Sequence, residues 1–288
     1  AEAGLTLIPQ FNVLGHAAGA RNRSDKHIIL DSRPELAPLF EPEGWSWCLS
    51  NPHTHVILRD AVTELHDFFG RPSYFHIGCD EAEDLGHCAL CRKRDLRRLV
   101  IDHILFFHEL FADRDARIIL WHDMLLEQGD ERFADFGTRN GLREFSFGTI
   151  VDELPKDIVI ADWMYGGAPP SEDFEYTTVN YFQDLGFPVL ACPWNQGDGI
   201  RALARMARRR KIEGLLTTFW HEDNGTKFFS ALFNAAQSTW GEPVPETPAH
   251  RLSFTRHLRQ ITTDMGLGND YPRTGSVTWQ IPPESITH

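Results

Sequence analysis

The feature that most constrains the fold is a recurring alternation of short apolar runs with longer helical patterns. The runs, rich in β-branched and aromatic residues, lie at residues 5–12, 73–81, 117–124, 157–165, 188–195 and 212–222. Helical patterns lie between or after them, at residues 51–69, 95–111, 172–185, 200–210 and 226–240. Strands that alternate with helices favour a parallel sheet with the helices outside it.

Each apolar run also ends in polar or aromatic residues. These ends carry Gln10 and Asn12, then His76, Asp80 and Glu81, then Trp121 and Asp123, then Asp162 and Trp163, then Trp194 and Asn195, and finally Trp220 and Glu222. In a (β/α)8 barrel the active site lies at the C-terminal ends of the strands, whereas an open doubly wound sheet gathers ligand residues mainly at one switch point. The sequence therefore predicts an α/β protein with a (β/α)8 TIM barrel.

The number of runs bears on how much of the barrel is present. A closed barrel of this type has eight strand–helix units, and the sequence offers about six. We therefore expect this chain to lack the first two βα units, so that residues 1–242 form strands 3 to 8 of a catalytic barrel. Residues 241–248 are rich in Pro and Glu, and residues 243–288 are expected to form a C-terminal extension.

Composition excludes some classes of partner. The formal net charge of the 288 residues is -13, which argues against nucleic acid or an anionic membrane as the main partner. No apolar run approaches the roughly 20 residues that cross a bilayer. The chain has 5 cysteines, and this small odd number favours an intracellular, cytoplasmic protein with free thiols.

The strongest chemical signal is an apolar strand that runs directly into two adjacent carboxylates, Asp80 and Glu81. Neighbouring residues of a strand point to opposite faces, so both can face one site only where the strand ends or kinks, and Gly78 permits that. Two carboxyl groups in one pocket push their pKa values apart, which suits one protonated acid and one ionised partner. A solvated acidic pair explains a lone Asp-Glu more simply, so the surrounding sequence decides.

That surrounding sequence resembles the family 20 glycoside hydrolases. Residues 76–81 (HIGCDE) resemble the family's His-x-Gly-Gly-Asp-Glu signature at the end of the fourth strand, and Cys79 is similar to the intracellular hexosaminidase D type. Residues 9–16 (PQFNVLGH) resemble the third-strand Pro-Glu…Pro-Gly-His block, with Gln10 in place of Glu. Residues 121–124 (WHDM) resemble the fifth-strand Trp block, and residues 219–222 (FWHE) resemble the eighth-strand Trp-x-Glu block.

The resemblance implies a β-N-acetylhexosaminidase that acts on glycans or glycoconjugates containing N-acetylhexosamine. It implies a retaining, substrate-assisted mechanism, in which the 2-acetamido oxygen attacks the anomeric carbon and forms an oxazolinium intermediate. Asp80 would accept a hydrogen bond from the acetamido N–H, and Glu81 would protonate the leaving oxygen and then deprotonate the incoming water. The resemblance implies no cofactor and no metal.

It also assigns a set of substrate-binding residues: His16, His76, Trp121, Asp123, Trp163, Trp194, Trp220 and Glu222. The tryptophans would wall the pocket, Glu222 would bind sugar hydroxyls, and the two histidines would orient the carboxylates. The family usually has a Tyr and an Asp at the end of the seventh strand, where this chain reads CPWNQ at residues 192–196. Trp194 or Asn195 would substitute there, or Tyr165 would reach in.

Two further motifs have plainer interpretations. Residues 87–91 (HCALC) have the Cys-x-x-Cys spacing of metal ligands, but the second Cys pair of a zinc ribbon is absent. Free thiols near the next helix are favoured over structural zinc, so the sequence predicts no metal site. The basic run at residues 205–211 is predicted to be the solvated face of a helix.

Two rival functions stay open at this point. In the first, the protein is a retaining glycosidase with Glu81 as acid and base and Glu222 as nucleophile, which needs the two carboxyl groups about 5–5.5 Å apart. Asp80 would then have no clear role. In the second, the protein is a non-catalytic sugar-binding barrel, since barrels host many functions.

Overall fold

The computed structural model describes residues 4–17, 28–126, 129–136, 148–165, 174–220 and 226–240. The chain forms two compact units, the first from Ala1–Met164 and Glu175–Ala191 and the second from Tyr165–Phe174 and Cys192–His288. The predicted boundary between the barrel and a C-terminal extension, at residue 242, lies outside the described residues and stays a prediction.

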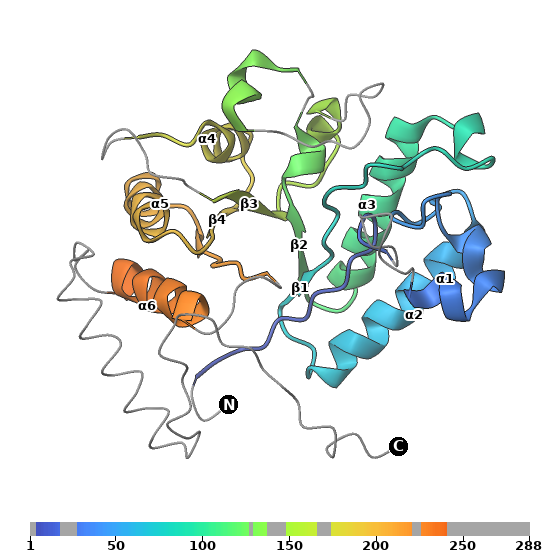
Figure 1. Ribbon diagram of the computed structural model, residues 1–288, viewed down its shortest axis with the longest axis horizontal. Coiled ribbons are helices and arrows are strands. Elements are labelled where there is room, and N and C mark those ends of the chain that lie inside the picture. The colour runs from blue at the N-terminus through green and yellow to red at the C-terminus, as the bar shows by residue number, and fades with distance from the viewer. Residues whose placement is uncertain are drawn as a thin grey trace. The chain divides into compact units, whose positions relative to one another are not determined.

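Strands and helices alternate along the first unit. Its elements are α1 (Ile28–Ser32), η1 (Pro34–Leu39), α2 (Pro52–Phe68), β1 (Tyr74–His76), η2 (Cys91–Lys93), α3 (Leu96–Ala112), β2 (Arg117–Trp121), η3 (Asp123–Leu125), η4 (Glu131–Phe136), η5 (Gly148–Asp152), most of β3 (Val159–Tyr165), α4 (Thr177–Asp184) and the start of β4 (Val189–Pro193). Figure 1 shows α2 and α3 on the same side of β1 and β2. The predicted strand–helix alternation is therefore present.

The sheet is parallel, and with β5 (Gly214–Leu215) its strand order follows the chain order, β1-β2-β3-β4-β5. Strand β1 pairs with β2 so that His76 lies opposite Ile119, and β2 pairs with β3 so that Trp121 lies opposite Ala161. This register brings the C-terminal ends of β1, β2 and β3 to the same edge. The prediction of an α/β barrel fold is confirmed, because sequential parallel pairing with helical crossovers is how such a barrel is built.

The predicted strand at residues 5–12 is largely an extended segment beside β1. Only Gln10 forms a bridge, parallel to His76. Backbone hydrogen bonds nevertheless continue on both sides of that bridge. His76 N–H donates to Pro9 O, Phe11 N–H to His76 O and Val13 N–H to Ile77 O, at 2.9–3.0 Å. The segment therefore lies where the preceding strand of the sheet belongs.

The core of the first unit forms between the sheet and helices α2 and α3. Asn51 caps α2 by accepting a hydrogen bond from His53 N, with Pro52 at the first turn, and Asp95 caps α3 by accepting one from Arg98 N. Helix α3 buries Val100, Ile104, Phe107 and Phe111, and Phe111 stacks on Phe75 of β1 with 4.4 Å between ring centres. This packing fixes the strand whose end carries the two adjacent carboxylates.

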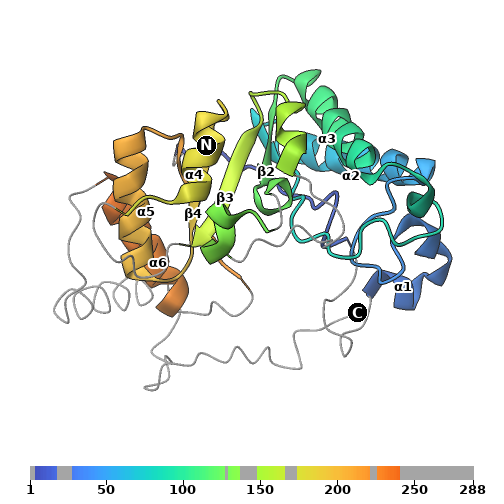
Figure 2. The same ribbon diagram turned by 90° about the horizontal axis from the view of Figure 1, so that it is seen from above.

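The second unit contains the end of β4, α5 (Gly197–Arg210), β5 (Gly214–Leu215) and α6 (Thr226–Trp240). Helices α5 and α6 lie side by side in both ribbon views (Figures 1 and 2). Ile200 of α5 packs with Ala231 and Ala235 of α6, and Phe219 packs against this cluster. The predicted helices at residues 200–210 and 226–240 are both confirmed.

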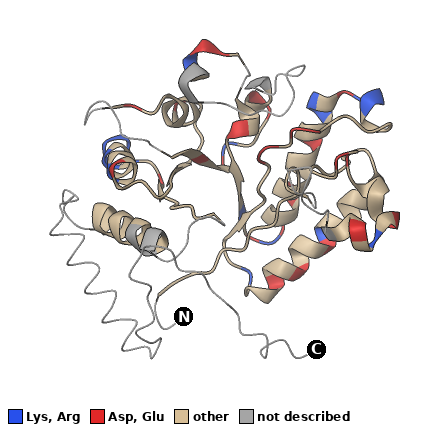
Figure 3. Cartoon of the chain, viewed as in Figure 1, with Lys and Arg blue, Asp and Glu red and all other residues tan. Residues whose placement is uncertain are grey.

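The basic residues at positions 205–211 lie at the C-terminal end of α5 and directly after it. The basic end of α5 is blue in Figure 3, and there Arg208, Arg209 and Lys211 are exposed while Arg205 and Arg210 are half-buried. The solvated helix face predicted for residues 205–211 is thus largely present. Within the described part of the chain, no helix combines the length and apolar character needed to cross a bilayer.

Candidate active site

The chain turns sharply after β1, and this turn decides where the adjacent carboxylates point. Gly78, Cys79 and Glu81 have φ angles of 71°, 72° and 48°, all in the left-handed region. Because the backbone leaves the extended conformation there, Asp80 and Glu81 do not alternate across a sheet and both reach the same imidazole. Cys79 and Glu81 carry a Cβ at positive φ, which costs on the order of 1 kcal/mol each and is common at functional sites.

Two glycines allow the preceding segment to lie directly against this turn. A Cβ at Gly15 would come within 2.0 Å of the carbonyl oxygen of Asp80, and one at Gly78 would come within 2.2 Å of Asn12 Oδ1. At Gly15 the clash is with backbone, which cannot give way, and at Gly78 a Cβ would also lie 3.0 Å from Asn12 Cα at a φ of 71°, so both positions favour glycine. The next residue after Gly15 is His16, which is thereby delivered to the carboxylates.

His16 joins the two carboxylates. Its Nε2 lies 3.1 Å from Asp80 Oδ2 and 3.4 Å from Glu81 Oε2. Burial works against a charge on this imidazole, but its close contacts with Asp80 and Glu81 outweigh burial and raise the pKa of His16 to about 9. At neutral pH the site therefore contains an imidazolium, which balances the charge of one carboxylate.

The same three groups could in principle hold a cation, since their ligand atoms lie within 4.8 Å of one another. With a proton on Nε2, His16 itself supplies positive charge to the pair, and a metal would have to displace that proton.

Asp80 retains an acceptor for a further group. The residue is 8% exposed, and its Oδ1 is buried without a hydrogen-bond partner among the described residues. A buried carboxylate oxygen without a donor costs about 1–3 kcal/mol or more, so such an atom is usually completed by a ligand or water. Asp80 can therefore accept an N–H or O–H from a bound molecule.

Asp123, at the end of β2, positions the other carboxylate. Its Oδ2 accepts the backbone N–H of Glu81 at 2.9 Å, and its Oδ1 accepts Trp163 Nε1–H at 3.0 Å. Burial, and after it the charge of Asp80, raise the pKa of Asp123 well above its usual value. Asp123 thus ties the strand ends of β1, β2 and β3 together, and its predicted role in substrate binding stays a prediction.

His76 and Trp121 are buried side chains that pack next to the turn. Their ring centres are 4.4 Å apart, and His76 Nδ1 accepts the backbone N–H of Gly78 at 3.0 Å. Burial lowers the pKa of His76 to about 3, so the ring is neutral and Nε2 carries the proton. Its described hydrogen bond holds the turn at Gly78, and its Nε2 is buried with no hydrogen-bond partner among the described residues.

Trp45 is a neighbour of the site that the sequence did not reveal. Its indole Nε1–H donates to the carbonyl oxygen of Glu81 at 2.5 Å, and its ring centre lies 4.2 Å from that of His16. Its backbone N–H also donates to Asp84 Oδ2 at 3.3 Å. Trp45 lies in a loop rather than at a strand end, so a search restricted to strand ends misses it.

The remaining predicted site residues belong to the second unit. Trp194 follows β4 and packs against Tyr165 with 5.3 Å between ring centres, and Trp220 is 37% exposed. Glu222 lies outside the described residues. The roles predicted for these three residues stay predictions.

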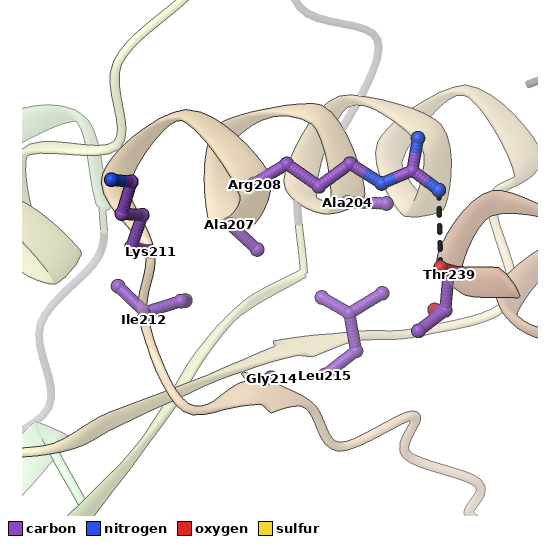
Figure 4. A pocket seen from close by; sticks show the side chains of 8 residues that line it. All are labelled: Ala204, Ala207, Arg208, Lys211, Ile212, Gly214, Leu215 and Thr239. Carbon is purple, nitrogen blue, oxygen red and sulfur yellow. Dashed lines mark hydrogen bonds between the residues drawn. The ribbon is translucent and has the colours of Figure 1, made fainter.

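A cavity of about 210 Å³ in the second unit has a different character (Figure 4). Its lining comes from the C-terminal half of α5, the start of β5 and the end of α6. There Arg208 donates to the carbonyl oxygens of Ser238 and Thr239 at 2.7 and 3.1 Å. The cavity adjoins the N-terminal end of β5, the end of a barrel strand that serves stability rather than catalysis.

Comparison with known protein families gives one assignment. The sequence model described as glycosyl hydrolase family 20, catalytic domain, matches residues 1–167, which is more than half of the chain and includes the turn at residues 78–81. A comparison with curated proteins finds no match.

Solved structures agree on the fold. An exo-β-N-acetylglucosaminidase of this family from Vibrio harveyi superposes with a TM-score of 0.60 at 16% identity, covering 91% of this chain and 43% of that enzyme. A β-N-acetylhexosaminidase from Bacteroides fragilis gives 0.56 at 17% identity, covering 91% and 53%. A further β-N-acetylhexosaminidase gives 0.62 at 13% identity, covering 97% and 62%. The chain thus spans less than two thirds of the length of each.

Proposed function

This chain belongs to glycosyl hydrolase family 20, and we propose on that basis that it removes terminal β-linked N-acetylhexosamine from glycans by a retaining, substrate-assisted reaction. Asp80 orients the substrate's 2-acetamido group, and Glu81 is the general acid and base. The resemblance to the hexosaminidase D subgroup is part of this proposal. The substrate class follows from the family and from the names of the structural neighbours, which act on N-acetylglucosamine or N-acetylhexosamine linkages.

One observation carries the proposal. Two adjacent carboxylates converge on a single imidazolium, with Nε2–oxygen distances of 3.1 and 3.4 Å. This imidazole holds the two carboxyl groups side by side, and Oδ1 of Asp80 is left to accept a donor from a ligand. Substrate-assisted hydrolysis uses one carboxyl group to hold the acetamido N–H and its neighbour to exchange a proton, and this pair can supply both.

The first half of the reaction breaks the glycosidic bond. The acetamido carbonyl oxygen attacks the anomeric carbon, the bond to the leaving oxygen breaks, and Glu81 gives its proton to that oxygen. The acetamido nitrogen gains positive charge as the oxazolinium ring closes. The free Oδ1 of Asp80 accepts the N–H of this group, and that hydrogen bond strengthens as the charge develops.

The second half restores the enzyme. Water attacks the anomeric carbon from the face that the leaving group vacated, and the ionised Glu81 takes a proton from it. The ring oxygen of the oxazolinium departs to regenerate the acetamide. Two displacements at one carbon give net retention, and no covalent bond to the protein forms.

The test asks whether the substrate supplies the nucleophile. The purified protein should hydrolyse an aryl N-acetyl-β-glucosaminide and leave the corresponding aryl β-glucoside essentially intact. A thiazoline analogue of the cyclised intermediate should inhibit strongly, because the site is complementary to that state.

A 2-fluoro glucoside with a good leaving group provides the opposite control. If Glu222 were the nucleophile, this reagent would leave a covalent adduct, detectable by intact-protein mass spectrometry. An adduct, or turnover of simple glucosides at a comparable rate, contradicts substrate assistance. Binding of N-acetylglucosamine without turnover of any aryl glycoside favours a sugar-binding protein instead.

A further inference from the structure

Three cysteines and a glutamate that are far apart in the sequence meet at one place in the first unit. They are Glu41, Cys48, Cys88 and Cys91, and one ligand atom of each lies within 4.8 Å of all the others. Cys48 Sγ lies 3.4 Å from Cys88 Sγ and 3.8 Å from Cys91 Sγ. Cys88 and Cys91 are the Cys-x-x-Cys pair of the sequence, and the fold supplies the further ligands whose absence argued against a metal.

We propose that Glu41, Cys48, Cys88 and Cys91 bind a structural zinc ion. Zinc takes four ligands in a tetrahedron, from thiolates at about 2.3 Å and from a carboxylate oxygen at about 2.0–2.2 Å. Thiolates at that distance from one ion are about 3.8 Å apart in a tetrahedron. The observed sulfur separations are close to this value, and a disulfide would need about 2.05 Å.

Glu41 is the member of the cluster that most requires a cation. It is 1% exposed, and its Oε2 accepts the backbone N–H of Cys88 at 2.6 Å. Its Oε1 is buried with no hydrogen-bond partner among the described residues. Buried carboxylates are normally paired with a positive group or coordinate a metal, and this cluster includes no cationic side chain. Oε1 is therefore the atom we assign as the fourth ligand.

The backbone is arranged to present sulfur atoms. Cys91 N–H donates to Cys88 Sγ at 3.2 Å, and Arg92 N–H donates to Cys88 O at 3.1 Å. Opposite them, a tight loop brings Glu41 and Cys48 together. In this loop Phe40 forms an antiparallel bridge with Trp47, and Glu41 N–H donates to Ser46 O. Four protein ligands leave no open position, so the site is structural rather than catalytic.

The ion would join two loops that flank the candidate active site. One is the loop 41–48, which carries Trp45 with its bond to Glu81 O, and the other is the loop 82–93 that follows Glu81. Zinc would hold these two loops together. The proposal concerns ligands outside the acid–base site, so it does not depend on the proposed glycosidase activity.

Metal analysis of the purified protein tests the assignment. Elemental analysis after growth with zinc should find about one zinc ion per chain. Cys48→Ser and Cys91→Ser should each reduce this to about a tenth or less under the same dialysis. Cys192→Ser, a buried cysteine of the second unit, is the matched control and should keep its zinc.

Two measurements keep the proposal testable if a variant fails to fold. X-ray absorption at the zinc edge of the wild-type protein should show about three sulfur neighbours and one oxygen or nitrogen neighbour. Glu41→Gln keeps an acceptor for Cys88 N–H but removes the anionic ligand, so it should weaken zinc retention against a chelator by about tenfold or more.

The opposite results are equally clear. Wild-type protein without bound metal after zinc loading overturns the proposal. So does a disulfide from Cys48 to Cys88 or Cys91, found by peptide mass spectrometry of unreduced protein. Zinc with mainly nitrogen and oxygen neighbours would mean that the ion lies elsewhere, for example at His16, Asp80 and Glu81.

Discussion

The first unit contains two clusters of acidic groups that are equally compact but differ in their chemistry. In each, ligand atoms lie within 4.8 Å of one another. The cluster at the strand ends is built from Asp80 and Glu81 and includes the imidazole of His16 at 3.1 and 3.4 Å. The cluster of Glu41 with three cysteines contains no basic group at all.

The difference lies in how negative charge is balanced. A histidine with a raised pKa can take up and release protons, which suits a site where a carboxylic acid must give and regain one. Thiolates and a buried carboxylate with no basic partner need a fixed positive charge, which suits a metal. Under the two proposals, the same density of acidic groups serves catalysis in one place and structural support in the other.

The largest expected effect is on kcat, and it should distinguish Glu81 from Asp80 by how the loss depends on the leaving group of the substrate. Glu81→Gln should reduce kcat by about 10²–10⁴-fold for a poor leaving group, because no acid protonates the departing oxygen. The loss should shrink for an acidic phenol, which departs without a proton. Asp80→Asn should reduce kcat by about 10²–10³-fold for both, because its hydrogen bond acts on the acetamido group and not on the leaving oxygen.

The measurement is kcat across a series of aryl N-acetylglucosaminides of different phenol acidity. Glu83→Gln, a carboxylate two residues further along the same loop, is the matched control and should stay close to wild type. Parallel losses for the Glu81 and Asp80 variants across the whole series would mean that Glu81 is not the acid.

A smaller effect should connect the two clusters through Trp45. Trp45→Phe keeps an aromatic ring near His16 but removes the N–H that donates to Glu81 O at 2.5 Å. Loss of a donor to a partly buried acceptor costs about 1–3 kcal/mol at most, so we expect kcat to fall by roughly tenfold. Since Trp45 positions Glu81 without touching substrate, KM should change little.

Trp47→Phe provides the comparison within the same loop, because Trp47 Nε1–H donates to Asn12 O at 3.0 Å instead. It should lower stability by a similar amount and leave kcat within roughly twofold. Equal losses of kcat in the two variants would mean that Trp45 contributes to packing only and does not position Glu81. Zinc content should be unchanged in both.

The sequence predicted the fold, and brought Asp80 and Glu81 forward as candidates, because both signals are encoded locally. Strand and helix periodicity is readable within about ten residues, and the described elements at residues 52–68, 96–112 and 226–240 match their predictions closely. Asp80 and Glu81 stood out because a strand and its C-terminal end are contiguous in sequence. The segment of residues 5–12 was harder, since it is held by bonds to β1 without regular pairing of its own.

What the sequence could not show depends on distant contacts. The Cys-x-x-Cys pair looked incomplete because Cys48 and Glu41 precede Cys88 by 40 and 47 residues. Trp45 likewise reaches Glu81 across 36 residues. No periodicity reports such pairs, since loops bring them together through the packing of the segments around them. The sequence likewise could not show that the two oxygens of Asp123 accept hydrogen bonds from Glu81 N and Trp163 Nε1, and its predicted role in substrate binding stays a prediction.

The last expected effect is a pH dependence of stability at the cluster with His16. The folded-state pKa of His16, about 9, lies above its ordinary value of 6.5. The stability that the imidazolium contributes is therefore fully present below pH 6.5 and is lost as the pH rises to about 9. The side chain is 31% exposed, so after allowance for solvent screening we expect a contribution on the order of 2 kcal/mol.

His16→Gln measures the contribution of the His16 imidazolium to the free energy of unfolding. The difference in free energy of unfolding between wild type and variant, from urea titrations at several pH values, should fall steadily between pH 6.5 and about 9. His55→Gln is the control with the opposite sign, because burial lowers the pKa of His55, so its difference should change below pH 6.5 and be flat above it. A difference for His16→Gln that is flat across this window would mean that His16 is neutral beside the carboxylates. The positive charge that distinguishes this cluster from the cysteine cluster would then have to come from another group.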